Sequence, residues 1–148
     1  MKPEILQILK TNTYLTLATI CHDGSPYGTP LRFAYDETKV YWLSLDETIH
    51  SQNIARDGRV FITVFNSQQN PEPGSRGAVY IRTIAHALEG EAELAARNVF
   101  ADRFYDSDKL GHDAKIYSAI IGEWDSEKSQ ELRFYMNGER LENQGATA

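Results

Sequence analysis

Short segments of alternating apolar and polar residues, separated by turn signals, constrain this chain more than any other feature. Asp23-Gly24 and Asp57-Gly58 are typical of turns, and each stands beside a run rich in β-branched and aromatic residues. Alternation with a period of two is typical of strands that bury one face. The predicted strands cover residues 14–20, 26–35, 40–45, 59–65, 77–85, 86–94 and 131–141.

A few helices are predicted between these strands. Apolar residues at helical spacing predict a first helix over residues 2–10, and Asp46 is a suitable N-cap for a short helix over residues 47–56. Two further segments are also predicted to be helical, residues 95–109 and 113–121. Residues 66–76 are rich in Pro, Gly and polar side chains and are predicted to form a loop, and the tail 142–148 is predicted to be flexible.

The length of 148 residues fits one domain, which we assign to residues 1–148. Aromatic residues make up 11% of the chain, and such side chains pack well on a pleated sheet. Closing short strands into a barrel removes exposed sheet edges. We therefore predict a mainly β protein with short helices (α+β), formed as a closed or nearly closed antiparallel barrel of six or seven strands.

Composition excludes several classes of function. The formal net charge of −6 disfavours nucleic-acid binding, which needs a basic surface. The single Cys21 has no partner for an internal disulfide, which favours a reducing compartment. No apolar run approaches the roughly 20 residues that span a bilayer. We expect a cytoplasmic protein without a membrane partner. The four His residues are scattered, so no metal site is predicted.

The start of the second predicted helix is the richest segment for binding chemistry. Thr48, His50 and Asn53 lie in or near its first turn, where unpaired backbone N–H groups and the helix dipole favour an anion. Arg32, on the second predicted strand, could add a guanidinium to the same phosphate. The alternative is an ordinary capped helix whose polar side chains are solvated.

Residues 16–64 resemble the flavin-binding split-barrel superfamily of pyridoxamine 5′-phosphate oxidase. The order of several motifs carries the resemblance: Leu17-Ala18-Thr19, Asp23-Gly24-Ser25-Pro26, Thr29-Pro30-Leu31-Arg32-Phe33, Val40-Tyr41-Trp42-Leu43-Ser44, Thr48-Ile49-His50-Ser51-Gln52-Asn53 and Arg56-Asp57-Gly58-Arg59-Val60. The resemblance implies a split β-barrel that forms a homodimer, with flavin mononucleotide (FMN) bound at the subunit interface.

The resemblance also implies which residues bind the cofactor. They fall into three groups, with Leu31, Arg32 and Phe33 at the isoalloxazine ring and ribityl chain, Trp42, Leu43 and Ser44 along the flavin, and Thr48, His50 and Asn53 at the phosphate. His50 stands where many relatives carry a Lys, which is the stronger phosphate anchor near neutral pH.

Two departures from the family pattern bear on activity. The basic positions of the second strand are matched here by Gly28 and Phe33, and the chain ends without the motif that holds the vitamin phosphate. We therefore expect an FMN-dependent oxidoreductase acting on a small organic substrate, but not the vitamin oxidase reaction. The alternatives are a non-catalytic flavin- or haem-binding protein and a reductase that uses deazaflavin. The catalytic residues, the substrate and the electron donor are not specified by the sequence.

Overall fold

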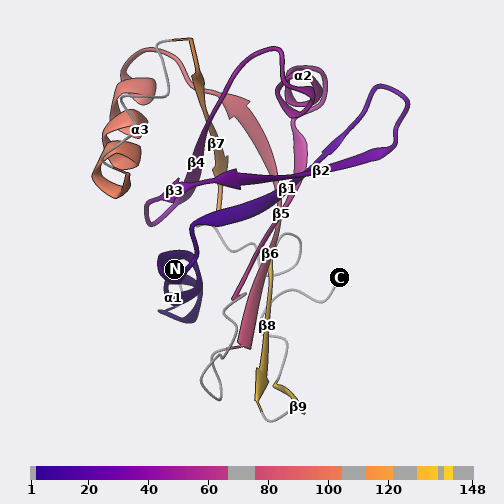
Figure 1. Cartoon of the computed structure of the whole chain (residues 1–148), viewed down its shortest axis with the longest axis vertical. Helices are drawn as coiled ribbons and strands as arrows, with labels where there is room; N and C mark the ends of the chain where they lie inside the picture. The colour runs from indigo at the N-terminus through magenta and orange to yellow at the C-terminus, as the bar shows by residue number, and fades with distance from the viewer. Residues whose placement is uncertain (1–2, 67–75, 105–112, 122–129, 137–138, 142–148) are drawn as a thin grey trace.

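A curled antiparallel sheet forms the framework of the protein (Figure 1). The computed structural model describes residues 3–66, 76–104, 113–121, 130–136 and 139–141. The strands are β1 (Tyr14–Ile20), β2 (Pro26–Arg32), β3 (Ala34–Tyr35), β4 (Lys39–Ser44), β5 (Arg59–Phe65), β6 (Arg76–Ala87), β7 (Lys115–Ile120), β8 (Gln130–Met136) and β9 (Glu139–Leu141). Seven of them follow the order β2-β1-β5-β6-β7-β4-β3, while β8 pairs with β6 and β9. The prediction of a mainly β split barrel is confirmed.

The barrel is left open between β2 and β3, the two ends of this order. The two strands are joined in the chain by Phe33 alone, although they are opposite ends of the sheet. The Phe33 ring is fully buried, and its amide donates a hydrogen bond to the carbonyl of Thr13 at 3.2 Å. The single strand predicted over residues 26–35 is therefore wrong at this point, because the buried ring turns the chain from one end of the sheet to the other.

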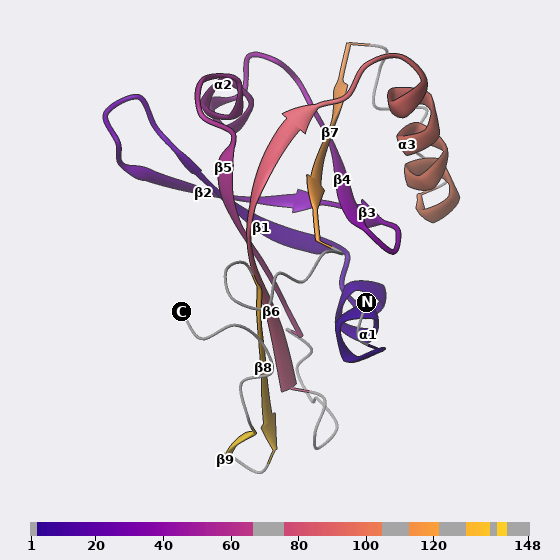
Figure 2. The same ribbon diagram turned by 180° about the vertical axis from the view of Figure 1, so that it is seen from behind.

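Three helices pack on the sheet: α1 (Pro3–Thr11), α2 (Ile49–Arg56) and α3 (Gly90–Arg103). The apolar side chains of α1, including Ile5, Ile8 and Leu9, belong to the main hydrophobic core. Figure 2 shows α2 and α3 near the same end of the barrel, on opposite sides of β4 and β7. The lower half of β6, with β8 and β9, extends away from the barrel (Figure 1). No helix among the residues described is long and apolar enough to cross a membrane.

Strand β4 contributes side chains to two separate hydrophobic clusters. Val40 and Trp42 point into the main core, whereas Tyr41 and Leu43 pack in a second cluster with Phe100 of α3. The alternation predicted for residues 40–45 is therefore correct, but α3 covers the face that would otherwise be exposed.

The second half of the chain differs most from the prediction. Strand β6 runs without a break to Ala87, and α3 begins at Gly90, so the predicted strand over residues 86–94 is wrong. Residues 113–121, predicted to be helical, contain strand β7, whose central four residues are all buried. A strand buried on both faces shows no alternation. Residues 67–75 of the predicted loop, 105–109 of the predicted helix and the tail 142–148 lie outside the residues described.

Asp36 organises the hairpin between β3 and β4. Its Oδ1 accepts hydrogen bonds from the amides of Thr38 at 2.7 Å and Lys39 at 2.8 Å, and Tyr41 donates its hydroxyl hydrogen to Oδ2 at 2.5 Å. Burial would raise the pKa of Asp36, but these hydrogen bonds outweigh it and hold the pKa below its ordinary value of 3.8. The ionised carboxylate is therefore the form that the folded state stabilises.

Replacing Asp36 with Ala is expected to lower the free energy of unfolding by about 1–3 kcal/mol at pH 7, measured by urea denaturation. Because the folded pKa lies below the unfolded one, the contribution of Asp36 is complete above pH 3.8 and is lost as the pH falls through the folded pKa. The difference between the wild type and the variant should shrink accordingly in acid. Glu37→Ala changes an exposed neighbour and is the control; equal destabilisation by both variants would contradict this role.

Candidate functional site

The chain enters α2 through a capped turn directly after β4. Thr48 is the N-cap, and its hydroxyl oxygen accepts a hydrogen bond from the Ser51 amide at 3.3 Å. The prediction that Asp46 caps a helix starting at residue 47 is wrong. Asp46 instead turns toward β7, where it pairs with Lys115 at 3.0 Å and accepts a hydrogen bond from the Tyr117 hydroxyl at 3.3 Å.

Four polar side chains meet at the start of α2, and we call them the α2 cluster: Ser44, Thr48, His50 and Ser51. Nε2 of His50 is hydrogen-bonded to the Ser44 hydroxyl and lies 3.2 Å from the Thr48 hydroxyl. Thr48 also donates to the Ser51 hydroxyl at 2.8 Å. The structure thus brings together three of the predicted cofactor residues. It adds Ser51, whose hydroxyl the sequence offers in the same turn but which was not among the residues assigned to the cofactor.

His50 is the ionisable member of the α2 cluster. Its side chain is only 7% exposed, and this burial lowers the pKa of the imidazole below its ordinary value of 6.5. The neutral imidazole is therefore favoured in the protein at neutral pH. A phosphate beside it would reverse this preference, because an anion stabilises the imidazolium.

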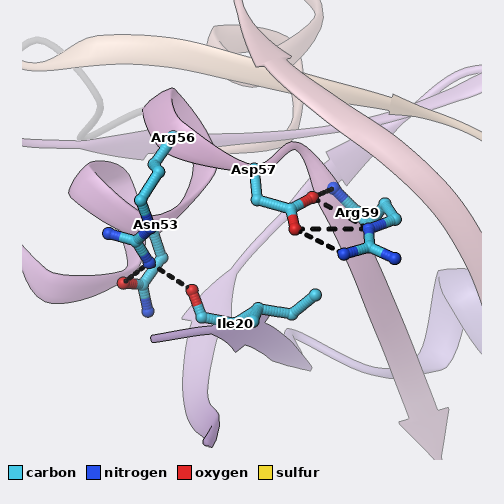
Figure 3. A network of polar contacts seen from close by, with 5 residues as sticks. All are labelled: Ile20, Asn53, Arg56, Asp57 and Arg59. Carbon is cyan, nitrogen blue, oxygen red and sulfur yellow. Dashed lines mark hydrogen bonds and ion pairs between the residues drawn. The ribbon is translucent and has the colours of Figure 1, made fainter. Parts of the chain in front are cut away.

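Asn53 points away from the α2 cluster and toward β1. Its amide nitrogen donates to the Thr19 hydroxyl at 2.9 Å, and its amide oxygen accepts from Arg56 at 3.0 Å. Figure 3 shows that Arg56 also reaches the carbonyl of Ile20, at 2.5 Å. The structure therefore does not place the Asn53 side chain with the other residues predicted at the phosphate.

The end of α2 is fixed against β5 and β6. Arg59 hydrogen-bonds the Asp57 carboxylate (Figure 3), with Nη2 to Oδ2 at 2.7 Å, and these bonds lower the pKa of Asp57 to about 2. Between them, the Gly58 carbonyl accepts a hydrogen bond from Ala85 at 2.8 Å. A Cβ at position 58 would lie 2.8 Å from the Ala85 carbonyl oxygen, so only Gly permits this approach.

One face of β2 lies on the same side of the sheet as the core residues of β1. Tyr27 pairs with Thr19, and Thr29 pairs with Leu17. Residues directly opposite each other in an antiparallel pair point to the same face, and both partners on β1 are buried. Leu31 lies on this face too, opposite Leu15. Tyr27 and Thr29 are therefore candidate site residues that the sequence analysis did not name. The alternation of residues 26–35 places both on the same face as Leu31.

The remaining predicted site residues lie elsewhere. The Arg32 guanidinium lies over the rings of Phe104 and Phe100, at 4.5 and 5.8 Å from their centroids, next to α3. Arg32 is paired with Tyr14, at the opposite end of β1 from the segment that α2 contacts. The structure thus does not bring Arg32 to the α2 cluster within one chain.

Phe33, Trp42 and Leu43 contribute to the core rather than to an open surface. Phe33 and Trp42 are fully buried, and the Trp42 ring stacks on Tyr117 with centroids 6.0 Å apart. Leu43 packs in the second cluster, on the α3 side of β4. A ligand at these positions would meet backbone more readily than side chains.

A depression of about 450 Å³ lies on the side of α2 that faces β6 and β7. Its lining includes Gln52, His86, Lys115 and Tyr117. The Lys115 ammonium and the Tyr117 hydroxyl are both turned to Asp46 there. Within the described part of the chain, no group of three or more His, Cys, Asp or Glu side chains could hold a metal ion.

A family model described as pyridoxamine 5′-phosphate oxidase matches residues 1–130. The chain belongs to this family. None of the curated proteins compared with it matches in sequence. This family is the one that residues 16–64 resemble, and the curled sheet agrees with it. The match to the family model extends the resemblance from residues 16–64 to residues 1–130.

Solved structures similar to this family member carry names with different cofactors. A haem-binding protein from Mycobacterium smegmatis has a TM-score of 0.74 at 19% identity, covering 98% of this chain, which spans only 59% of that protein. The haem storage protein HutZ from Vibrio cholerae has a TM-score of 0.71 at 17% identity, covering 98% and 96% of the two chains. An FAD-binding protein from Mesorhizobium loti has a TM-score of 0.67 at 20% identity, covering 91% and 96%. At these identities the likeness shows the fold alone.

NMR titration of the ligand-free protein is expected to show the His50 imidazole titrating below pH 6.5, because its burial disfavours the charged form. Below pH 6.5 the unfolded chain then binds more protons at this position than the folded one. The free energy of unfolding should therefore decrease as the pH falls from 6.5 through the folded pKa. His50→Gln should remove this component, whereas His22→Gln, at an exposed turn, should retain it. An imidazole that titrates at or above 6.5 would contradict the burial argument.

Proposed function

We propose that the protein is an FMN-binding flavoprotein that acts as an oxidoreductase on a small organic substrate. The observation that carries the proposal is the α2 cluster at the N-terminus of a helix, next to the open side of a split barrel. Membership of the pyridoxamine 5′-phosphate oxidase family supports a flavin, and the similar FAD-binding protein from Mesorhizobium loti supports it at the level of the fold.

The α2 cluster fits the phosphate group of FMN. Hydroxyls from Ser44, Thr48 and Ser51 can donate to phosphate oxygens, and the first backbone N–H groups of α2 carry the positive end of the helix dipole. Burial lowers the pKa of His50 and so favours its neutral form at neutral pH when no ligand is bound, and the imidazole can take up a proton as the anion binds. The positive charge on His50 would thus appear only when the phosphate binds.

The inward face of β2 fits the other end of the cofactor. Tyr27, Thr29 and Leu31 are half-buried on this face. Because β2 is an end strand of the sheet among the residues described, backbone groups along it can hydrogen-bond a planar ring. A flavin bound there would supply hydride and electron transfer, while the protein would position it and shape access for the substrate.

Titration with FMN tests the proposal directly. The wild type should take up FMN with a flavin spectrum that dithionite bleaches and air restores. Between pH 8 and 6.5 the affinity should rise as the pH falls, because binding of the phosphate promotes protonation of His50. His50→Ala should weaken binding by about 10- to 100-fold, the cost of losing one charged partner, and His50→Lys should remove the pH dependence.

His22→Ala is the matched control, since His22 is exposed and outside the α2 cluster. A colourless protein that takes up no added FMN would contradict the proposal. A Soret-type band after incubation with haemin, without flavin binding, would assign the barrel to haem instead.

We further propose that the functional unit is a homodimer with the flavin at the interface. The outer face of β1 and β5 carries Tyr14 and Phe65, which are 61% and 52% exposed, whereas α3 packs further along the sheet, against β4. A depression of about 460 Å³ lies between these two residues and Pro30 at the β2 edge. Phe61 and Tyr80 continue the aromatic surface across β5 and β6, with ring centroids 6.1 Å apart. A second copy of this chain would bury such a surface and complete the open side of the barrel.

Light scattering is expected to report a dimer for the wild type. Phe65→Asp should shift the protein toward a monomer, since it places a charge in the proposed apolar interface, and it should weaken FMN binding together with dimerisation. Leu94→Asp is the matched control, because Leu94 is also an exposed apolar residue, at 65%, but lies on α3. A wild type that is a clean monomer while binding FMN would contradict the shared site.

A further inference from the structure

We infer that Thr19, Asn53 and Arg56 act as positioning residues that hold α2 at a fixed distance from β2. The α2 cluster and the inward face of β2 are the two sides of the proposed flavin site, so this distance sets the width of the site. The inference rests on the proposed function only for its effect on flavin binding. The effect on the position of α2 stands independently.

A continuous path of polar contacts joins α2 to β2 through β1. The Asn53 amide nitrogen donates to the Thr19 hydroxyl at 2.9 Å, and that hydroxyl lies 3.5 Å from the Tyr27 carbonyl oxygen. Thr19 and Asn53 are both almost completely buried, which makes an unpaired amide or hydroxyl at either position costly. Helix α2 thus meets the β1–β2 hairpin, which lies much earlier in the chain, through one side-chain amide and one hydroxyl.

Arg56 fixes the orientation of the Asn53 amide. It donates to the Asn53 amide oxygen at 3.0 Å and to the Ile20 carbonyl at 2.5 Å (Figure 3). Both ends of the Asn53 side chain are therefore engaged in holding the helix to the end of β1. The resemblance implied that Asn53 contacts the phosphate. In this geometry Asn53 instead holds α2 in place, and it affects the phosphate end of the site only through the position of the helix.

The connection to the α2 cluster is short and stiff. Asn53 lies one helical turn after His50, and α2 has eight residues, a length of about 12 Å. A helix this short moves as a unit. Loosening the Asn53 contact would therefore displace the hydroxyls and imidazole at its N-terminus, while the interior of the barrel keeps its packing.

The test compares Thr19→Val with Thr19→Ser. Valine keeps the shape of threonine but removes the hydroxyl, whereas serine retains it. Ser51 and Gln52 donate their amide hydrogens to the Thr48 hydroxyl and carbonyl. Hydrogen exchange at these two amides in the flavin-free protein should be accelerated in Thr19→Val, and Thr19→Ser should restore the wild-type rates. Unchanged exchange in Thr19→Val would overturn the inference, whatever the protein binds.

Flavin binding supplies the second readout. Thr19→Val should weaken FMN by about tenfold, the equivalent of one net hydrogen bond, while riboflavin, which lacks the phosphate, should change by less than about twofold. Equal weakening of both ligands would mean a general loss of structure and would overturn the positioning role. If the wild type binds neither flavin while the exchange result holds, the proposed function fails and the positioning role stands.

Arg56→Met is a second test, needed because Thr19→Val changes a buried position and could simply unfold the protein. Arg56 is exposed, so the variant removes no core side chain and should still fold, with a melting temperature lowered only by the loss of the hydrogen bonds to Asn53 and Ile20. It should accelerate the same two amides and lower the preference for FMN over riboflavin. Arg59→Met, which breaks the neighbouring pair with Asp57, is the control and should leave that preference unchanged.

Discussion

The turn at Phe33 is the constraint on which the site depends. A sheet whose ends β2 and β3 are one residue apart in the chain must curl, but the same corner prevents those ends from hydrogen-bonding to each other. The buried ring and the bond to Thr13 hold the corner in place. The barrel therefore has backbone groups of an end strand available beside its interior, which a closed barrel would not offer.

Helix α2 supplies the polar side chains of the candidate site. Its N-terminus carries the α2 cluster, and its C-terminus is fastened at Gly58, where the backbone passes too close to Ala85 for any side chain. The polar contacts of Asn53 and Arg56 fix the C-terminal half of the helix to β1. The residues at the opening are few, but the contacts that place them extend through three strands.

The sequence was informative where local pattern and burial agree. Strands with one exposed face, such as β1 and β5, follow the predicted alternation closely. Strand β7 was missed because it is buried on both faces, and the start of α3 was missed because only Ala96 and Phe100 of that helix are buried. At the site, the place of Thr48 and His50 at the start of the helix could be read from the sequence. Ser44 was assigned with Trp42 and Leu43 by the family resemblance, and its contact with His50 is seen only in the structure. The direction of Asn53 could not be read from the sequence either, since it depends on Thr19, which lies 34 residues earlier.

Strand β4 has a consequence for how any ligand reaches the barrel. Its alternate side chains are buried in two clusters, one inside the barrel and one beneath α3, and Ser44 is its last residue. Separating β4 from its neighbours would expose both clusters together, so this wall cannot open on its own at a modest cost. A ligand of the proposed site would therefore approach beside β2, the end strand of the sheet, rather than through β4. What covers β2 would then decide how freely such a ligand is exchanged.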